Sequence, residues 1–453
     1  MHTIIAFLLF VLVSPASGNL LPERAKGFGP VPRLLSDAPT LEQVGPTEPD
    51  HLFGWQSQGT FPNTVFTDLS FCDDSVGFAS AELGVVYRTT NSGQTWTRVM
   101  NLGFPYYWYG VHVLSRQDVL VTGFNNSAGT GIYRWSSDGG TTWDSIVTLD
   151  TANWFSRVKF ADSLHGIILA GWNGGIWRTE NAGRNPVDWS YVQVDPSRGW
   201  FEGSFTFRPD HHCYITGISF CHSSDAGASW DVQHSADPVF DGGVSFPDSL
   251  NGWTGGGQIS APVSGWVHRT TDGGQIWSDR LTETPGPVRC LLFLNDTLGF
   301  IAGGNLYSQV GFIYSTTDAG DSWTMDVNTG SEMKGIGWAW AGPDSVDIWC
   351  AGFNSSFTGC VYRTRIGFGT SGVGQAGGCT RHGSRISPNP ARGWLDLELG
   401  VRQKQGYRLL DASGRTRLSG SARGLSRLNV ASLPAGWYLL EAGRAAQPVV
   451  ITR

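Results

Sequence analysis

The chain has 453 residues, of which only 15% are charged, while 61 are glycine and 20 are tryptophan. This composition excludes a disordered chain and is typical of many short strands joined by tight turns, with large side chains filling the core. The formal net charge of −7 argues against nucleic acid as a partner.

The N-terminus has the pattern of a targeting segment. Residues 4–13 form an apolar run of ten residues, too short to span a bilayer, and small residues follow as far as Gly18. This pattern predicts a signal peptide over residues 1–18, followed by an N-terminal extension over 19–50. No other segment has about 18 unbroken apolar residues. We therefore expect an exported protein without a membrane span in the mature chain.

One short motif recurs through the middle of the chain, with the pattern Ser/Thr-x-Asp/Asn-x-Gly and, in most copies, a tryptophan three residues after the glycine. Its Asp or Asn positions are Asn91, Asp138, Asn181, Asp225, Asp272 and Asp318. Their spacings of 47, 43, 44, 47 and 46 residues define a repeat. A further 47 residues lead to a decayed copy at Arg365.

The motif has the chemistry of a tight turn. Asp and Asn side chains accept hydrogen bonds from backbone N–H groups a few residues on, and the glycine adopts positive φ without steric cost. A β-prone run precedes each copy, and a second turn of the type Asp-Ser/Thr-x-Gly precedes several of these runs, as at 74–77 and 296–299, with one residue more at 162–166 and 248–252. Each repeat therefore predicts four short strands. A residue repeated six times is interpreted as a turn residue, because six copies cannot converge on one catalytic or metal site.

Four-stranded units of about 45 residues, arranged radially, are the blades of a β-propeller. We therefore predict an all-β protein with a seven-bladed propeller over residues 51–370, followed by a small β-sandwich. The last repeat lacks a fourth strand, and we expect the segment 51–61, which contains Trp55, to supply it. This pairing would close the ring and leave no free sheet edge.

The repeated motif resembles the Asp-box, or neuraminidase-type, repeat of β-propellers. The wider pattern around 268–277 is most similar to propellers of the photosystem II stability/assembly factor type, and sialidases, sortilin ectodomains and xyloglucan-cleaving hydrolases carry similar boxes. The resemblance implies that the box is a structural hairpin at the blade periphery. It also keeps two alternative functions open, which are glycoside hydrolysis and an assembly-factor role.

The C-terminal part is predicted to be a separate module. A flexible linker over 371–384 precedes a small β-sandwich over 385–453, which has eleven basic and four acidic residues. This module resembles the C-terminal sorting domain of bacterial type IX secretion substrates, through the motif residues Pro388, Asn389, Pro390, Gly414, Pro434 and Gly436. The resemblance implies that residues 385–453 engage the secretion machinery and deliver the protein outside the cell. The alternative is a plain structural module.

Strand alternation divides the loops of such a propeller between two faces. We use the name "turn face" for the face that carries the motif turns and the turns between the first and second strands of each blade. We use the name "loop face" for the opposite face, which carries the loops between the second and third strands and the connectors between blades. The loop face is variable and aromatic, so we expect ligand binding there. The candidate binding residues are Tyr106, Tyr107, Trp108, Trp154, Trp200 and Trp338, with packing inside the blades as the alternative.

The sequence assigns no catalytic residue. Glu202, Asp241 and Glu332 are carboxylates near the loop face, but nothing in their spacing brings two of them together. His211 and His212 are adjacent, so on a strand they face opposite sides, and we expect neither a metal nor a cofactor. The sequence therefore favours a non-catalytic propeller, secreted or held at the cell surface, that binds or scaffolds a protein or glycan ligand.

Overall fold

The computed structural model describes residues 53–451 except 152, 172–173, 197–203, 209, 218, 234–241, 259–262, 307, 343–344, 368–384, 393, 399–404, 412–415, 423–424, 434–435 and 443–444. The predicted signal peptide, N-terminal extension and linker lie outside the described residues, as do Trp200, Glu202, Asp241, Gly414 and Pro434. In the described part, no helix is long and apolar enough to cross a membrane.

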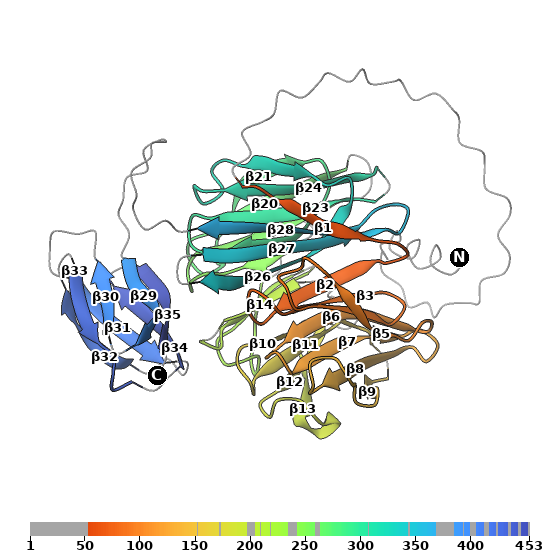
Figure 1. Ribbon diagram of the computed structural model, residues 1–453, viewed down its shortest axis with the longest axis horizontal. Coiled ribbons are helices and arrows are strands. Elements are labelled where there is room, and N and C mark those ends of the chain that lie inside the picture. The colour runs from red at the N-terminus through yellow and green to blue at the C-terminus, as the bar shows by residue number, and fades with distance from the viewer. Residues whose placement is uncertain are drawn as a thin grey trace, which may run out of the picture. The chain divides into compact units, whose positions relative to one another are not determined.

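Seven four-stranded sheets account for the strands of residues 56–367 (Figure 1). Blade 1 contains β2 (Phe66–Phe71), β3 (Gly77–Ala81), β4 (Val85–Thr89) and β5 (Thr97–Asn101). Blade 2 contains β6 (Tyr106–Val113), β7 (Val119–Asn125), β8 (Thr130–Ser136) and β9 (Val147–Asp150). Blade 3 contains β10 (Phe155–Phe160), β11 (Gly166–Ala170), β12 (Gly175–Thr179) and β13 (Trp189–Gln193). Blade 4 contains β14 (Ser204–Phe207), β15 (Cys213–Thr216), β16 (Phe220–Ser223) and β17 (Asp231–Gln233).

The remaining three blades follow the same order. Blade 5 contains β18 (Val244–Ser245), β19 (Gly252–Gln258), β20 (Ser264–Thr270) and β21 (Ser278–Thr284). Blade 6 contains β22 (Val288–Phe293), β23 (Gly299–Asn305), β24 (Val310–Thr316) and β25 (Thr324–Asn328). Blade 7 contains β26 (Glu332–Gly342), β27 (Ser345–Phe353), β28 (Gly359–Gly367) and, from the start of the chain, β1 (Gln56–Phe61).

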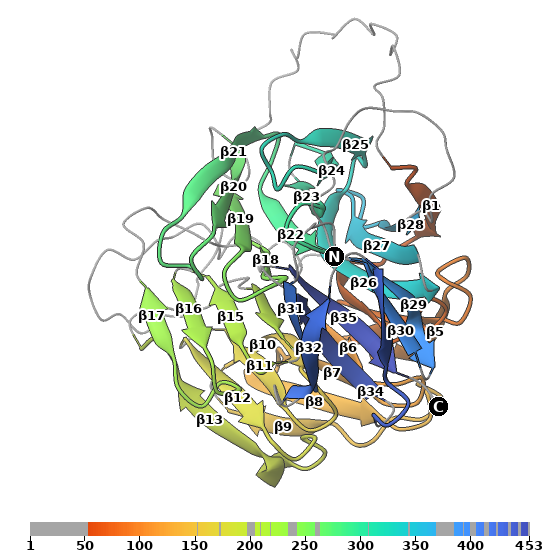
Figure 2. The same cartoon turned by 90° about the vertical axis from the view of Figure 1, so that its left-hand side faces the viewer.

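The first strands of the seven blades surround one axis. Strand β2 contacts both β6 and β26, and the contacts continue in order through β10, β14, β18 and β22 back to β26. Figure 2 looks onto this ring and shows the sheets radiating outward from it. The domain is therefore a seven-bladed β-propeller, which confirms the predicted fold class.

Strand β1 closes the ring. It pairs antiparallel with β28, so that Gln56 lies opposite Arg363 and Phe61 lies opposite Gly359. Without β1, blade 7 would end on an unpaired β28, and an unpaired edge is a template for association with other chains. The segment around Trp55 therefore supplies the fourth strand that the last repeat lacks.

The side chains of the repeated motif hold the turns between third and fourth strands. In blade 2, the N–H of Thr142 donates to Asp138 Oδ1 at 2.8 Å, and the Thr142 hydroxyl donates to Oδ2 at 2.6 Å. The hydroxyl of Ser136 donates to Asp138 and accepts the N–H of Gly140, whose φ of +83° suits glycine. Equivalent backbone N–H groups donate to the side chains of Asn91, Asp225, Asp272 and Asp318.

The motif copy in blade 3 departs from this pattern. Among the described residues the Asn181 side chain accepts no hydrogen bond from its turn, and only its own N–H donates, to the Thr179 hydroxyl at 3.1 Å. The turn is longer here and contains a short 3-10 helix, Pro186–Asp188. The N–H of Asn185 donates to the Asp188 carboxylate at 2.8 Å. The inserted residues have therefore replaced the motif contact with a second turn.

Buried tryptophans of the second strands join neighbouring blades. Trp253 of β19 donates from Nε1 to the carbonyl of Ala319, in the motif turn of blade 6, at 2.9 Å. Its ring also stacks on Phe293 of β22, with 3.7 Å between the ring centroids. Trp349 of β27 makes the same kind of bond to the carbonyl of Ser92 at 3.0 Å. Each motif turn of this kind is thus a docking point for the preceding blade.

The C-terminal module has seven strands in the order β32-β31-β34-β35-β29-β30-β33. They are β29 (Arg385–Arg392), β30 (Trp394–Glu398), β31 (Gln405–Asp411), β32 (Thr416–Ala422), β33 (Leu425–Asn429), β34 (Gly436–Ala442) and β35 (Ala445–Ile451). Its core joins Leu395 and Leu428, from β30 and β33, with Leu409 and Leu440, from β31 and β34. The module is therefore a small β domain with its own hydrophobic core.

Candidate functional site

Backbone hydrogen bonds show which loops share a face. In blade 1 the motif turn bonds to the turn between β2 and β3, because the N–H of Ser92 donates to the carbonyl of Ser75 at 3.1 Å. The connector to blade 2 bonds instead to the loop between β3 and β4, since the N–H of Gly103 donates to the carbonyl of Leu83 at 2.9 Å. The turn face and the loop face expected from strand alternation are therefore both present.

Three aromatic rings meet near the loop face, between blades 2 and 3. The rings of Tyr107 and Tyr109 on β6 are stacked, with 6.3 Å between centroids and 17° between planes. Trp154, in the connector before β10, meets Tyr109 edge to face at 5.2 Å. All three side chains keep part of their surface accessible. Flat, partly exposed rings of this kind can stack on a sugar or hold a peptide.

A glycine makes room for the Trp154 indole. The N–H of Gly171, just after β11, donates to the carbonyl of Trp154 at 2.8 Å. A Cβ added to Gly171 would lie only 2.0 Å from Trp154 Nε1. The indole therefore packs directly over the backbone at this position, and any larger residue at Gly171 would displace it.

A carboxyl group with a raised pKa lies in the same region. Glu82 is in the loop between β3 and β4, and burial raises its pKa to about 7, against the opposing attraction of Lys334 on β26. Burial and then the charge of Glu82 raise the pKa of Tyr107. Perturbed groups of this kind concentrate at functional sites, so Glu82 joins the candidate residues. No signal in the sequence marked Glu82, because it lies in a short loop that is not aromatic.

Glu332 is a different kind of carboxylate. It begins β26, is only 5% exposed, and pairs with Arg289 Nε at 2.7 Å and with Lys334 Nζ at 3.2 Å. A carboxylate paired with cations on both strands holds β22 and β26 together. The pKa of Glu82, in contrast, is raised by burial to about 7. The site therefore offers rings, one protonatable carboxyl group and a nearby cation.

The other predicted binding residues lie elsewhere. Trp108 is fully buried between blades 1 and 2, because side chains alternate along β6 and Tyr107 and Tyr109 occupy the other side. Tyr106 is partly buried against the same core cluster. Trp338 is 40% exposed but lies inside β26, four residues before the strand ends at the turn face, and not in a connector as expected. Trp200 lies outside the described residues.

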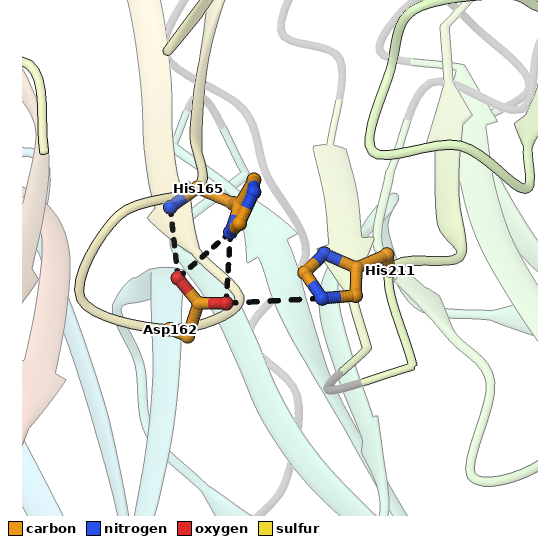
Figure 3. Close-up of side chains that lie close together, drawn as sticks. All are labelled: Asp162, His165 and His211. Carbon is orange, nitrogen blue, oxygen red and sulfur yellow. Dashed lines mark hydrogen bonds and ion pairs between the residues drawn. The ribbon is translucent and has the colours of Figure 1, made fainter. Parts of the chain in front are cut away.

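The turn face holds a cluster of one carboxylate and two imidazoles that was not predicted from the sequence (Figure 3). Asp162 and His165 belong to the turn between β10 and β11, and His211 belongs to the turn between β14 and β15 of the next blade. His165 Nδ1 lies 2.9 Å from Asp162 Oδ2, and His211 Nε2 lies 3.8 Å from the same oxygen. His211 and His212 indeed diverge, but His211 meets partners from another blade. A signal existed in the sequence, because His165 stands within one of the Asp-Ser turns.

The residues that resemble a sorting motif are only partly described. Pro388, Asn389 and Pro390 lie within β29, and Gly436 begins β34. Gly414 and Pro434 lie outside the described residues. The described motif residues therefore lie on strands of a small β domain.

No family model and no curated protein sequence matches this chain. Solved structures do match its propeller. A structure described as YCF48 bound to D1 peptide aligns with a TM-score of 0.50 and 18% identity, over 68% of this chain and 96% of that chain. The U3-55K structure aligns with a TM-score of 0.52 and 9% identity, over 69% and 98%. Streptogramin B lyase aligns with a TM-score of 0.50 and 12% identity, over 69% and 98%. At these identities the likeness shows the propeller fold alone.

Proposed function

We propose that this chain is an exported, non-catalytic propeller whose loop face binds an extended segment of a protein ligand. The observation that carries the proposal is the ring cluster of Tyr107, Tyr109 and Trp154 on the face where the repeats differ. The rings supply rigid apolar contact area, and Glu82 and Lys334 supply polar groups in the same region. A propeller of the same fold has been solved with a peptide bound, which supports a peptide as the first ligand class to test.

The test uses the full chain, a phage-displayed random-peptide library and a glycan array. We expect the wild-type chain to enrich a peptide family, and Trp154→Ala to weaken binding of the enriched peptide by about 30-fold or more, as for a hot-spot aromatic. Gly171→Ala should weaken it too, because it displaces the indole without removing it. Trp338→Ala is the matched control, since that ring is exposed but lies toward the other face.

The outcomes separate the ligand classes. Enrichment on the glycan array alone, lost with Trp154→Ala, would replace the peptide by a sugar at the same site. Equal binding by wild type and Trp154→Ala, with loss in Trp338→Ala, would contradict the proposed face.

Glycoside hydrolysis remains the second candidate, and one observation favours it. The pKa of about 7 at Glu82 is in the range that suits a general acid at neutral pH. A screen with aryl glycosides decides the matter. Turnover by the wild-type chain that disappears in Glu82→Gln, with the fold retained, would replace the binding proposal by an enzymatic one, and no turnover supports the binder.

We further propose that residues 1–18 and the C-terminal module direct export. The support is the sequence resemblance of residues 385–453 to a type IX sorting domain, together with their basic charge, which suits an acidic transport or surface component. Cell fractionation with and without residues 385–453 tests this role. Retention of the shortened chain inside the cell envelope is expected. Unchanged export would leave the module as a structural one.

A further inference from the structure

We propose that Asp162, His165 and His211 form a zinc site that ties blade 3 to blade 4 on the turn face (Figure 3). One ligand atom from each of the three residues lies within 4.8 Å of the other two. Asp162 Oδ2 is the atom that faces both His165 Nδ1 and His211 Nε2. The site is on the opposite face from the ring cluster. The zinc proposal therefore does not depend on the proposed function.

The turn itself does not require a histidine. The N–H groups of Leu164 and His165 both donate to Asp162 Oδ1 at 2.8 Å, which fixes the carboxylate. Blade 5 has the same turn with Asn251 in place of His165, and there the amide donates to Asp248 Oδ2 at 2.8 Å. An amide thus suffices to complete the turn. In blade 3 the imidazole occupies the place of that amide, since His165 Nδ1 lies 2.9 Å from Asp162 Oδ2, and unlike the amide it supplies a nitrogen that can bind a metal.

The distance to His211 is that of two ligands and not of a hydrogen bond. The 3.8 Å between His211 Nε2 and Asp162 Oδ2 exceeds hydrogen-bonding range. Two ligands that each lie about 2.1 Å from one tetrahedral zinc ion are about 3.4 Å apart. The 3.8 Å from His211 Nε2 to Asp162 Oδ2 is longer than this, and the 2.9 Å from His165 Nδ1 to Asp162 Oδ2 is shorter, so zinc would replace the hydrogen bond between His165 and Asp162 and draw His211 closer.

The backbone of blade 4 directs His211 toward blade 3. His211 has a φ of +67°, which is uncommon for a residue other than glycine. Its carbonyl accepts the N–H of Ala226 at 3.1 Å, and its own N–H donates to the carbonyl of Arg208 at 3.0 Å. The guanidinium of Arg208 is paired with Asp210 at 2.7 Å, so its charge is compensated. The imidazole is therefore presented across the blade boundary on a well-held turn.

Another blade boundary shows what such a contact does. Between blades 1 and 2, Arg116 donates from Nε to Asp73 at 2.7 Å and joins the two turns directly. Between blades 3 and 4 an arginine reaches the motif turn instead, since Arg178 Nε of β12 donates to the carbonyl of Ala226 at 3.2 Å. The strands of blade 4 are short, with three or four residues each, and supply few ladder bonds. An ion held by Asp162, His165 and His211 would make the corresponding tie.

The donor set favours zinc or a related transition metal. Two imidazole nitrogens and one carboxylate oxygen suit Zn²⁺, whereas Mg²⁺ and Ca²⁺ prefer oxygen ligands alone. Three protein ligands leave one position of a tetrahedron open, and the side chains remain partly exposed, at 36%, 28% and 25% for Asp162, His165 and His211. Water or a donor from another molecule would complete the coordination.

The experiment measures zinc binding to the full chain after treatment with a chelator. Isothermal titration with Zn²⁺ should give one saturable site in the wild type, and Co²⁺ should give the visible spectrum of a tetrahedral site. His165→Asn copies the turn of blade 5, and His211→Asn keeps a residue that tolerates positive φ. Each should weaken zinc binding by more than about 100-fold, since even supporting residues of metal sites are worth 10- to 100-fold.

Two comparisons keep the proposal falsifiable. His222→Asn removes one member of a neighbouring imidazole pair, in which His212 Nδ1 lies 2.9 Å from His222 Nε2, and should leave zinc affinity unchanged. Zinc should raise the melting temperature of the wild type but not that of His165→Asn, whose melting temperature without zinc should match the wild type. No saturable binding by the wild type, or loss in His222→Asn with retention in His211→Asn, would overturn the site.

Discussion

The two faces of the propeller use polar side chains in opposite ways. On the turn face, Asp138, Asp225, Asp272 and Asp318 are each bonded to N–H groups of their own turn. On the loop face, Glu82 is held by no such turn, and burial moves its pKa to about 7. A side chain that completes a local turn in every repeat is committed to folding. Glu82 lies outside the motif turn, so its carboxyl group is available for chemistry.

Removing the closing strand should have the largest effect. Deletion of residues 53–61 leaves the edge of β28 unpaired and removes Phe53 and Trp55, whose rings contact Phe300. We expect a loss of more than about 5 kcal/mol, comparable to the whole stability of a domain, with association through the free edge. Light scattering and thermal unfolding measure both effects. A monomer with the wild-type transition would contradict the closed ring, and deletion of residues 19–50 serves as the control.

The tryptophan contacts between blades should come next. Trp253→Ala removes a fully buried indole, and the expected loss is about 3–5 kcal/mol in chemical denaturation. Trp253→Phe keeps a ring to stack on Phe293 but leaves the Ala319 carbonyl without its donor, so it should cost about 1–3 kcal/mol. A Trp253→Phe variant as stable as the wild type would show that the bond to the motif turn contributes nothing.

A motif carboxylate should matter less, and its contribution should depend on pH. Asp272→Ala frees the N–H groups of Gln275 and Ile276 on an exposed turn, so we expect a loss of about 1 kcal/mol at pH 7. The N–H of Ile276 and the hydroxyl of Thr270 hold the pKa of Asp272 below its ordinary value. The folded state therefore binds the proton less tightly than the unfolded state.

The sign of the pH effect follows from that depressed pKa. The stabilisation by Asp272 is fully present above the unfolded pKa of about 4 and is lost as the pH falls through the lower folded value. The difference in unfolding free energy between wild type and Asp272→Ala should thus shrink on acidification below about pH 4. A difference that stays constant down to pH 2 would contradict the hydrogen-bonded carboxylate.

The same motif position in blade 3 should have the smallest effect. The Asn181 side chain accepts no bond from its turn in the described structure, so Asn181→Ala should change the unfolding free energy by less than about 0.5 kcal/mol. Chemical denaturation should compare this variant with Asn91→Ala. The Asn91 side chain does accept the N–H of Thr95, at 2.9 Å, so Asn91→Ala should lose more stability. A loss at Asn181 as large as that at Asn91 would mean that the motif stabilises by another route.

Much of the fold was predictable because its signals are local. A turn residue, its glycine and the spacing of its copies lie within a few positions of one another, and they predicted seven blades and the closing strand. The sequence was less accurate about which residue accepts the hydrogen bonds in the turns between first and second strands. In the shorter turns between first and second strands, the accepting side chains are Asp73 and Asn295, one residue earlier than the motif suggested.

The candidate site was only partly predictable. Tyr107 and Trp154 lie near the loop face, whereas Trp108 is buried and Trp338 lies deep in β26. Alternation along β6 would have favoured Tyr107 and Tyr109 over Trp108. Trp338 was predicted to lie in a connector for a different reason. Strand β26 is eleven residues long and includes the segment that had been interpreted as a connector.

By itself the sequence determined how many blades there are and what turns join their strands, because these depend on hydrogen bonds between near neighbours in the chain. The fourth strand missing from the last repeat also indicated which segment closes the ring. Only the tertiary structure decided which side chains meet across blades. Glu82 with Tyr107, and Asp162 with His211, come from different repeats. These contacts depend on strand register and on the packing of one sheet against the next, and the repeat pattern contains no information about either.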